Sequence, residues 1–375
     1  MKKLISATIL VFLVLSFAKN AFAYRIGDVD VNLLASAQEI YDDNILYSNI
    51  NVKKDYSTNF AVGISGTAEG KTRMLTFKSD VKFQRYARFT KFDNVAEDLH
   101  ASLSQDLSSR SGLNFTEDFT HAEEPHSFED QFGGTQIRYD YYINNFGANF
   151  THEFTKQFSI LGKYYNQFYS PNREDLINSF LNDAAIEADY AITSKSILLA
   201  TTEYLNRKFE NSIDIGTTRY AGGLRQYFSP QFYVEGRIGQ DFAESSDKQK
   251  HNSMYYQGTV SDDIDVKTNF SVAYLKQDNS TFYMQEIFKS QRVSVSLKRN
   301  LLKRLNIFLS GFYGTGDYTR SDITTKFIGG AVNFSYDILP NIQANIAYSY
   351  SKTNSNLSSW EYNKNLISLG LNGEF

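Results

Sequence analysis

Cysteine is absent from the 375 residues of this chain. Without thiols there is no disulfide framework, and both thiolate catalysis and cysteine-ligated metal sites are excluded. Proline is scarce as well, with four residues. Because proline cannot donate to a ladder of backbone hydrogen bonds, its scarcity suits long uninterrupted strands.

Long apolar runs are missing except at the N-terminus, and a mean hydropathy of -0.40 excludes a helical membrane protein. The exception is Leu4 to Ala18, which follows Lys2 and Lys3 and precedes Ala-Phe-Ala at residues 21–23. A basic region, a short apolar region and a small-x-small site are the parts of a cleaved signal peptide. The run is also shorter than the roughly 20 residues of a membrane-spanning helix. We predict cleavage after Ala23, export from the cytoplasm, and a mature domain of residues 24–375.

An excess of positive charge is also lacking, since 38 Lys and Arg stand against 42 Asp and Glu. Nucleic acid is therefore not an expected partner, because it requires a basic face. Aromatic residues, in contrast, are abundant, with 26 Tyr and 30 Phe. Aromatics at this frequency in a polar chain indicate alternation with polar residues.

The alternation is visible along the whole mature region. Phe60, Val62 and Ile64 alternate with small residues, and the next segment sets apolar positions from Leu75 to Phe83 against Lys78, Asp80 and Lys82. A period of two places successive side chains on opposite faces of a sheet. The second face is too charged for a protein core. A slip of the pattern at residues 144–145 predicts a β-bulge.

Short turns alternate with longer polar connections, and together they divide the mature chain into about 16 to 18 strands. An even number of strands, with short turns on one side and long loops on the other, is typical of an outer-membrane barrel whose short turns are periplasmic. Segments of about 10 residues or more are long enough to cross a bilayer when tilted. We predict an all-β fold, a single closed antiparallel transmembrane β-barrel. A secreted propeller or β-helix is the alternative, but no fixed repeat is visible.

The last segment places every second residue on one face and ends on an aromatic carboxylate. This pattern resembles the terminal signal that outer-membrane barrels present to their assembly machinery, and it is carried by Ile367, Leu369, Leu371 and Phe375. The expected partners are therefore the barrel assembly machinery, outer-membrane lipid and lipopolysaccharide.

The polar face defines the candidate functional residues. A barrel of 16 to 18 strands is too wide for side chains to fill, so its interior is expected to hold water. The predicted lumen-lining residues are Lys78, Asp80, Lys82, Arg138, Asp140, Lys163, Glu187, Asp189, Glu203, Arg219, Arg225, Glu235 and Arg237. Such charges can create a transverse field along a diffusion path, or they can form a solvated wall of paired residues without solute preference.

The segment Asp42-Asp43-Asn44 could offer oxygen ligands to a divalent cation, but it lacks the spacing of a calcium loop and equally suits a turn. The longer segment of residues 39–45, Glu-Ile-Tyr-Asp-Asp-Asn-Ile, resembles the opening of the Putative beta-barrel porin 2 family. That resemblance implies a porin-like barrel, and for some members an association with exopolysaccharide export and its periplasmic components. It implies no catalytic residue.

The acidic connection of residues 121–134 is, in order, the third outside loop, which general porins fold inward to narrow the pore. Its candidate constriction residues are Glu123, Glu124, Glu129 and Asp130, which could face Arg219, Arg225 and Arg237. The alternative is an exposed, solvated loop.

We expect a channel for small hydrophilic solutes or a component of an export system in the outer membrane. A non-conducting surface barrel with binding loops is the first alternative, and a hydrolase acting at the rim is the remote one. The five histidines include His121 and His126 in the acidic loop, but no nucleophile with an oriented base is apparent. We therefore predict no catalytic residue, no metal and no cofactor.

Overall fold

The computed structural model describes residues 24–123, 138–174, 176–281 and 284–375. Two short 3₁₀ helices, η1 (Thr90–Phe92) and η2 (Ser358–Trp360), interrupt an otherwise all-β chain. The strands are β1 (Tyr24–Ile26), β2 (Val29–Asp42), β3 (Asp55–Glu69), β4 (Arg73–Tyr86), β5 (Asn94–Ser108), β6 (Ser111–Ala122), β7 (Tyr141–Glu153), β8 (Phe158–Pro171), β9 (Ser179–Ala191), β10 (Ser196–Phe209), β11 (Ile215–Tyr227), β12 (Phe232–Ser245), β13 (Lys250–Asp265), β14 (Thr268–Ser280), β15 (Ile287–Leu302), β16 (Leu305–Tyr318), β17 (Thr324–Leu339), β18 (Ile342–Ser355) and β19 (Tyr362–Glu374).

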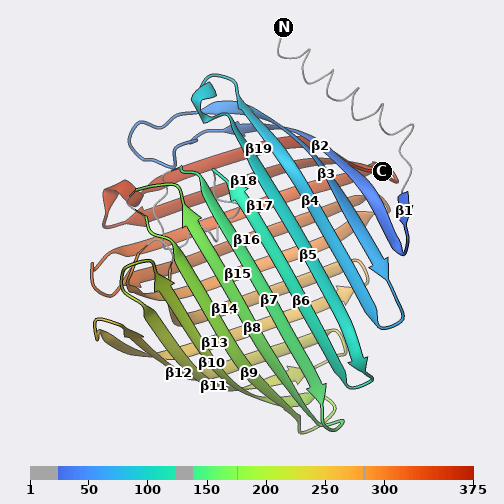
Figure 1. Cartoon of the computed structure of the whole chain (residues 1–375), viewed down its shortest axis with the longest axis vertical. Coiled ribbons are helices and arrows are strands. Elements are labelled where there is room, and N and C mark those ends of the chain that lie inside the picture. Colours follow the sequence, from blue (N-terminus) through green and yellow to red (C-terminus); the bar gives the residue numbers. More distant parts are fainter. Residues whose placement is uncertain (1–23, 124–137, 175, 282–283) are drawn as a thin grey trace.

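The strands form one antiparallel ring. Each strand from β2 to β19 pairs with the next, and β19 pairs with β2, which closes a barrel of 18 strands. The short β1 extends the ring only as a hairpin with β2. Figure 1 shows the near and far walls crossing, as expected for strands that tilt in a closed barrel. The predicted fold and strand number are confirmed.

The connections fall into two classes at opposite ends of the barrel. Those that follow odd-numbered strands from β3 to β17 are short turns, and they share an end with the C-terminus. Those that follow even-numbered strands are mostly longer, as in residues 43–54 between β2 and β3, although residues 246–249 between β12 and β13 are as few as in the longest turns. By the usual layout of such barrels, the first end is periplasmic and the second extracellular.

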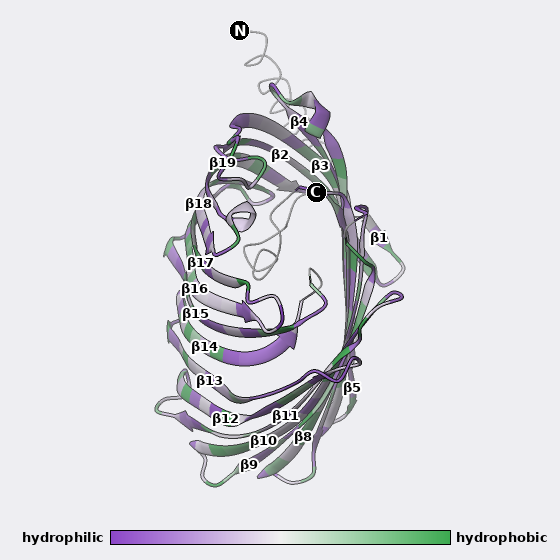
Figure 2. Ribbon diagram, turned by 90° about the vertical axis from the view of Figure 1, so that its left-hand side faces the viewer, coloured by the Kyte–Doolittle hydropathy of each residue, from purple (hydrophilic) through white to green (hydrophobic). Residues whose placement is uncertain are grey.

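The apolar residues of the alternating segments share the outer face of the ring. Phe60 lies opposite Phe83, and Ile346 lies opposite Leu369, in continuous register. Val62, Ile346 and Leu369 are exposed. Along the ribbons of Figure 2, hydrophobic and hydrophilic segments alternate around an enclosed interior. Buried apolar residues in the described part form only small clusters, so these side chains do not pack into a two-sheet core.

The predicted bulge at Asn144 and Asn145 is wrong. Asn144 pairs opposite Phe119 and Phe168 without a register shift, so it simply occupies an outward position that usually carries an apolar residue. The register shifts lie instead beside four short turns, between residues 106 and 108, 262 and 265, 300 and 302, and 337 and 339.

The two ends of the barrel sheet are fastened together. The backbone N–H of Leu33 donates to the carbonyl of Phe375 at 2.7 Å, and the Phe375 N–H donates back at 2.9 Å. The Phe375 ring is 5% exposed and packs with Ala35 and Ile342. In the described part of the chain, no helix has the length and apolarity to traverse a bilayer.

Candidate functional site: the lumen wall

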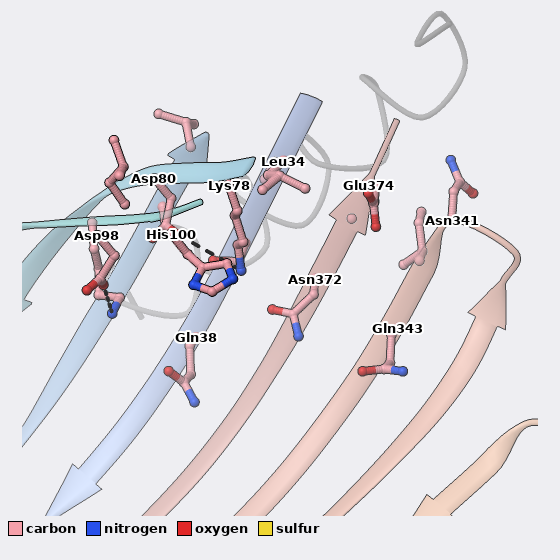
Figure 3. Close-up of a pocket in the computed structure, with 18 of the residues that line it drawn as sticks. Leu34, Gln38, Lys78, Asp80, Asp98, His100, Asn341, Gln343, Asn372 and Glu374 are labelled. Carbon is pink, nitrogen blue, oxygen red and sulfur yellow. Dashed lines mark ion pairs between the residues drawn. The ribbon is translucent and has the colours of Figure 1, made fainter. Parts of the chain in front are cut away.

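A hollow of about 750 Å³ lies on the inner side of the wall, where β2 to β6 meet β18 and β19. Lys78, Asp80 and Lys82 of β4 line it, and the amides of Gln38, Gln343 and Asn372 project from neighbouring strands (Figure 3). Further lining residues are Asp98, His100, Asp118 and Glu374. The hollow therefore combines charges of both signs with neutral hydrogen-bonding groups.

The two lysines in this hollow make long ion pairs, whereas its histidine makes a close contact with an aspartate. Lys82 Nζ lies 3.8 Å from Asp98, and Lys78 Nζ lies 4.0 Å from Asp80. The Lys78 side chain is 59% exposed. His100 Nδ1 and Asp118 Oδ1 are 2.6 Å apart. Loose pairs at exposed positions keep their groups available to water and solutes.

A second set of charges, the charged ladder, lies on the inward face of β8 to β12. It consists of Lys163, Glu187, Glu203, Arg219, Arg225, Glu235, Arg237 and Asp241. Arg219 reaches Asp241 at 2.7 Å and Glu203 at 2.5 Å, and its guanidinium lies 4.3 Å from the Tyr255 ring centroid. Charge-assisted bonds of this length are the strong ones in proteins.

Arg219, Arg225 and Arg237, which the sequence analysis set opposite the acidic loop, are each paired with acidic residues of the strands. Arg225 pairs with Glu235 at 2.6 Å, and Arg237 pairs with both Glu187 and Glu235 at 2.8 and 2.6 Å. Their counter-charges therefore come from the same wall, either from the same strand or from strands one to three positions away. Asp189 shares the inward face of β9 with Glu187, opposite Leu199 and Ser159.

Arg138 and Asp140, two of the predicted lumen-lining residues, precede β7, which begins at Tyr141. The Arg138 guanidinium stacks on the rings of Tyr86 and Phe92, 4.8 and 5.2 Å from their centroids, and its Nε lies 3.1 Å from Glu123. Asp140 lies 2.8 Å from His121 Nε2. These two residues therefore brace the extracellular end of the wall. The other constriction candidates, Glu124, Glu129 and Asp130, lie outside the described residues.

The inward element that sequence analysis missed is the outer end of the β14–β15 hairpin. Ile287 is fully buried in a cluster with Phe209, Ile215 and Ala243 of β10 to β12. The Asp278 N–H donates to Asp241 Oδ2 at 2.7 Å. Because β13 stands between β12 and β14 in the wall, these contacts require the hairpin to bend across the inner face of β13. The only sequence signal was its mixture of apolar and polar residues.

Polar contacts hold the bent hairpin on the charged ladder. Asp278 Oδ2 lies 2.6 Å from His251 Nδ1, and the Arg219 guanidinium donates to the Asp278 carbonyl at 3.5 Å. Arg207 Nε donates to Ser280 Oγ at 3.3 Å. The hairpin therefore narrows the extracellular half of the lumen next to the arginines.

The Asp42-Asp43-Asn44 segment fastens the β2–β3 connection to β19. Asp42 pairs with Lys364 at 2.7 Å, and its Oδ1 accepts from the Asn44 N–H at 2.8 Å. Asp43 accepts from the backbone and side chain of Asn365, both at 2.7 Å. These contacts support the turn interpretation of this segment. Among the described residues, no group of three or more acidic or histidine side chains is arranged to hold a metal.

One Ser–His contact bears on the hydrolase alternative. Ser111 Oγ and His152 Nδ1 lie 2.8 Å apart at the end of the barrel that carries the short turns. In the part of the chain that the structure describes, no carboxylate contacts the His152 ring to orient it. The arrangement therefore lacks the third member of a triad.

A closed ring of long antiparallel strands, with an apolar outer face and a charged inner face, defines an outer-membrane-type β-barrel. Residues 278–375 match the family described as Putative beta-barrel porin 2. The resemblance predicted from residues 39–45 is thereby confirmed, through a different part of the chain.

Several solved outer-membrane channels are similar in fold. OpdK of Pseudomonas aeruginosa, solved with vanillate, has 10% identity and a TM-score of 0.47, covering 92% of this chain and 98% of that one. OccK2 (OpdF) of the same organism has 9% identity and a TM-score of 0.49, with coverages of 93% and 99%. OccAB3 of Acinetobacter baumannii has 10% identity and a TM-score of 0.46, with coverages of 92% and 99%. No curated protein matches the chain.

Proposed function

We propose that the protein is an outer-membrane channel through which small hydrophilic solutes diffuse. The observation that carries this proposal is the closure of 18 strands around an inner face of charged and amide side chains. Barrels of 16 to 18 strands leave an aqueous passage unless an element plugs them. Export through the predicted signal peptide and assembly by the barrel machinery are parts of the same proposal.

The hollow and the charged ladder have different roles in this channel. Exposed groups such as Lys78 can exchange water for solute hydrogen bonds at small cost. The ladder keeps charges of both signs at the wall beside the inward hairpin, so we expect weak selectivity between small cations and anions. A link to exopolysaccharide export stays a prediction from the family resemblance.

Conductance across a planar bilayer tests the proposal. The refolded protein should produce stepwise, ohmic current increments in potassium chloride, with reversal potentials close to zero under a salt gradient. A barrel that inserts without conducting would support the surface-binding alternative. Insertion is checked separately, by the mobility shift of folded barrels on unheated gels.

A further inference from the structure

The pairing between β13 and β14 ends before either strand does. Its last pair at the extracellular side is Tyr256 with Lys276. Residues 250–255 of β13 continue to pair with β12, and residues 277–280 of β14 continue to pair with β15. Among the described residues, both strands thus carry a free edge where the hairpin bends inward. Such edges leave backbone donors and acceptors without ladder partners, which is costly near a membrane.

Two buried polar atoms mark the same place. Ser253 Oγ on β13 and Asn279 Oδ1 on β14 are buried without a hydrogen-bond partner in the described part of the chain. If the register of Tyr256 with Lys276 continued toward the extracellular side, Ser253 would lie directly opposite Asn279. Directly opposite side chains are close enough to hydrogen-bond across strands. The two orphaned atoms would then satisfy each other.

We propose that residues 277–280 of β14, together with residues 287–290 of β15 that pair with them, form a two-position gate. In the narrow position it lies across the ladder, as in the structure. In the wide position residues 277–280 pair with residues 252–255 of β13, which extends the ladder of the wall and clears the lumen. Each position pairs hydrogen-bonding groups that have no such partner in the other position. Neither position therefore makes all of the possible contacts. The gate rests on the proposed channel function and adds a regulated width to it.

The contacts that favour the narrow position are identifiable. The wide position gains the missing ladder and the Ser253–Asn279 contact. It loses the burial of Ile287 and the bonds of Asp278 to the ladder.

A contact between the β12–β13 and β16–β17 connections, here called the clasp, also favours the narrow position. Arg320 of the β16–β17 connection pairs with Asp247 of the β12–β13 connection and donates to Gln249, which itself donates to Thr319 at 3.2 Å. These two connections flank the hairpin in wall order, so an outward hairpin would separate them.

A disulfide trap tests the gate directly, because the chain has no cysteine of its own. The trap is the double variant Ser253→Cys/Asn279→Cys. The matched control is Gln257→Cys/Leu275→Cys, at a pair that is in register in both positions. Directly opposite residues have the Cα spacing that a disulfide needs. Both variants are refolded into phosphatidylcholine vesicles, oxidised with diamide, and assayed for the bond by mass spectrometry and for conductance in planar bilayers.

The trap should oxidise more slowly than the control, because its bond forms only when the hairpin visits the wall. Once formed, the bond should raise single-channel conductance by roughly twofold, since the narrowest cross-section widens, and reduction should reverse the change. The control bond should leave conductance unaltered. A trap that stays reduced while the control oxidises fully overturns the gate, and so does an oxidised trap whose conductance equals that of its reduced form. If the protein never conducts, the channel proposal fails, while bond formation still reports whether the hairpin moves.

Discussion

Arg237 on β12 donates to Glu187 on β9 at 2.8 Å, although β10 and β11 stand between these strands in the wall. The contact is possible because the wall curves and long inward side chains converge. Arg237 also holds Glu235 at 2.6 Å, so one guanidinium joins two carboxylates. Its side chain is only 10% exposed and that of Glu187 only 5%. The ladder is therefore a structural brace as well as a lining.

Breaking this brace should destabilise the barrel. Arg237→Gln removes one cation from each of two poorly hydrated carboxylates, Glu187 and Glu235, which keep Lys163 and Arg225 as partners. Removal of one member of an isolated buried pair typically costs about 3 to 5 kcal/mol. Because other cations remain, the free energy of unfolding, measured by urea titration in lipid vesicles, should fall by less than that amount but by more than for an exposed pair. Lys78→Gln is the matched control, since its exposed pair with Asp80 should contribute about 1 kcal/mol or less. Equal effects of the two substitutions would contradict this account of the ladder.

Removing all three predicted arginines should change ion selectivity. In the triple variant of Arg219, Arg225 and Arg237 to Ser, the acids Glu187, Glu203, Glu235 and Asp241 lose their counter-charges, so the wall becomes negative. Reversal potentials under a salt gradient should shift toward cation selectivity. The shift should shrink at molar salt, where the Debye length is about 3 Å. An unaltered reversal potential at low salt would show that these residues do not face the conducting path.

Insertion should depend on which face of β19 carries a charge. Leu369 is 62% exposed on the outward face, whereas Asn372 lines the hollow inside. Leu369→Asp should sharply reduce the amount of folded barrel in the outer membrane, because charge on the lipid face is destabilising, by about 2 to 4 kcal/mol for the worst residues and less for Asp. Asn372→Asp introduces the same charge on the other face and should insert normally. Deletion of Phe375 should also impair assembly, since that ring packs with Ala35 and Ile342.

The ring of strands was predictable because its information is local and repeated. Alternation such as Phe60, Val62 and Ile64 assigns a face to each residue, and the turn signals divide the strands. The position of Arg138 and Asp140 just before β7 was less predictable, because the alternation does not say at which residue a strand begins.

The lumen was less predictable than the wall, because side chains that meet there come from different strands. The sequence around Asp278 does not indicate a contact with Asp241, which lies 37 residues earlier. The alternation assigns Arg219 to the inner face, but it could not reveal that Asp241 on the neighbouring strand pairs with it. Pairing between side chains of distant strands across the curved wall is therefore visible in the three-dimensional structure and not in the sequence.

The clasp between Arg320 and Asp247 gives the last prediction, which concerns the gate. Arg320→Ala removes the ion pair that holds the flanking connections together, and the hairpin should occupy the wide position more often. The measurement is the oxidation rate of the Ser253→Cys/Asn279→Cys trap, which should increase in the Arg320→Ala background. Oxidation of the Gln257→Cys/Leu275→Cys control should not change.

The protonation of Asp247 sets the pH range of this effect. The hydrogen bond from Ser245, together with Arg320, lowers the pKa of Asp247 below its ordinary value of 3.8. A lowered carboxyl pKa means that the clasp is intact above that ordinary value and is lost only as the pH falls through the lowered one. Asp247 therefore stays ionised between about pH 5 and pH 8, and its titration should not alter the oxidation rate of the trap in that range. Asp247→Asn should raise the rate at every pH in that range, as Arg320→Ala does. The clasp has no part in gating if both variants oxidise at the rate of the unmodified trap.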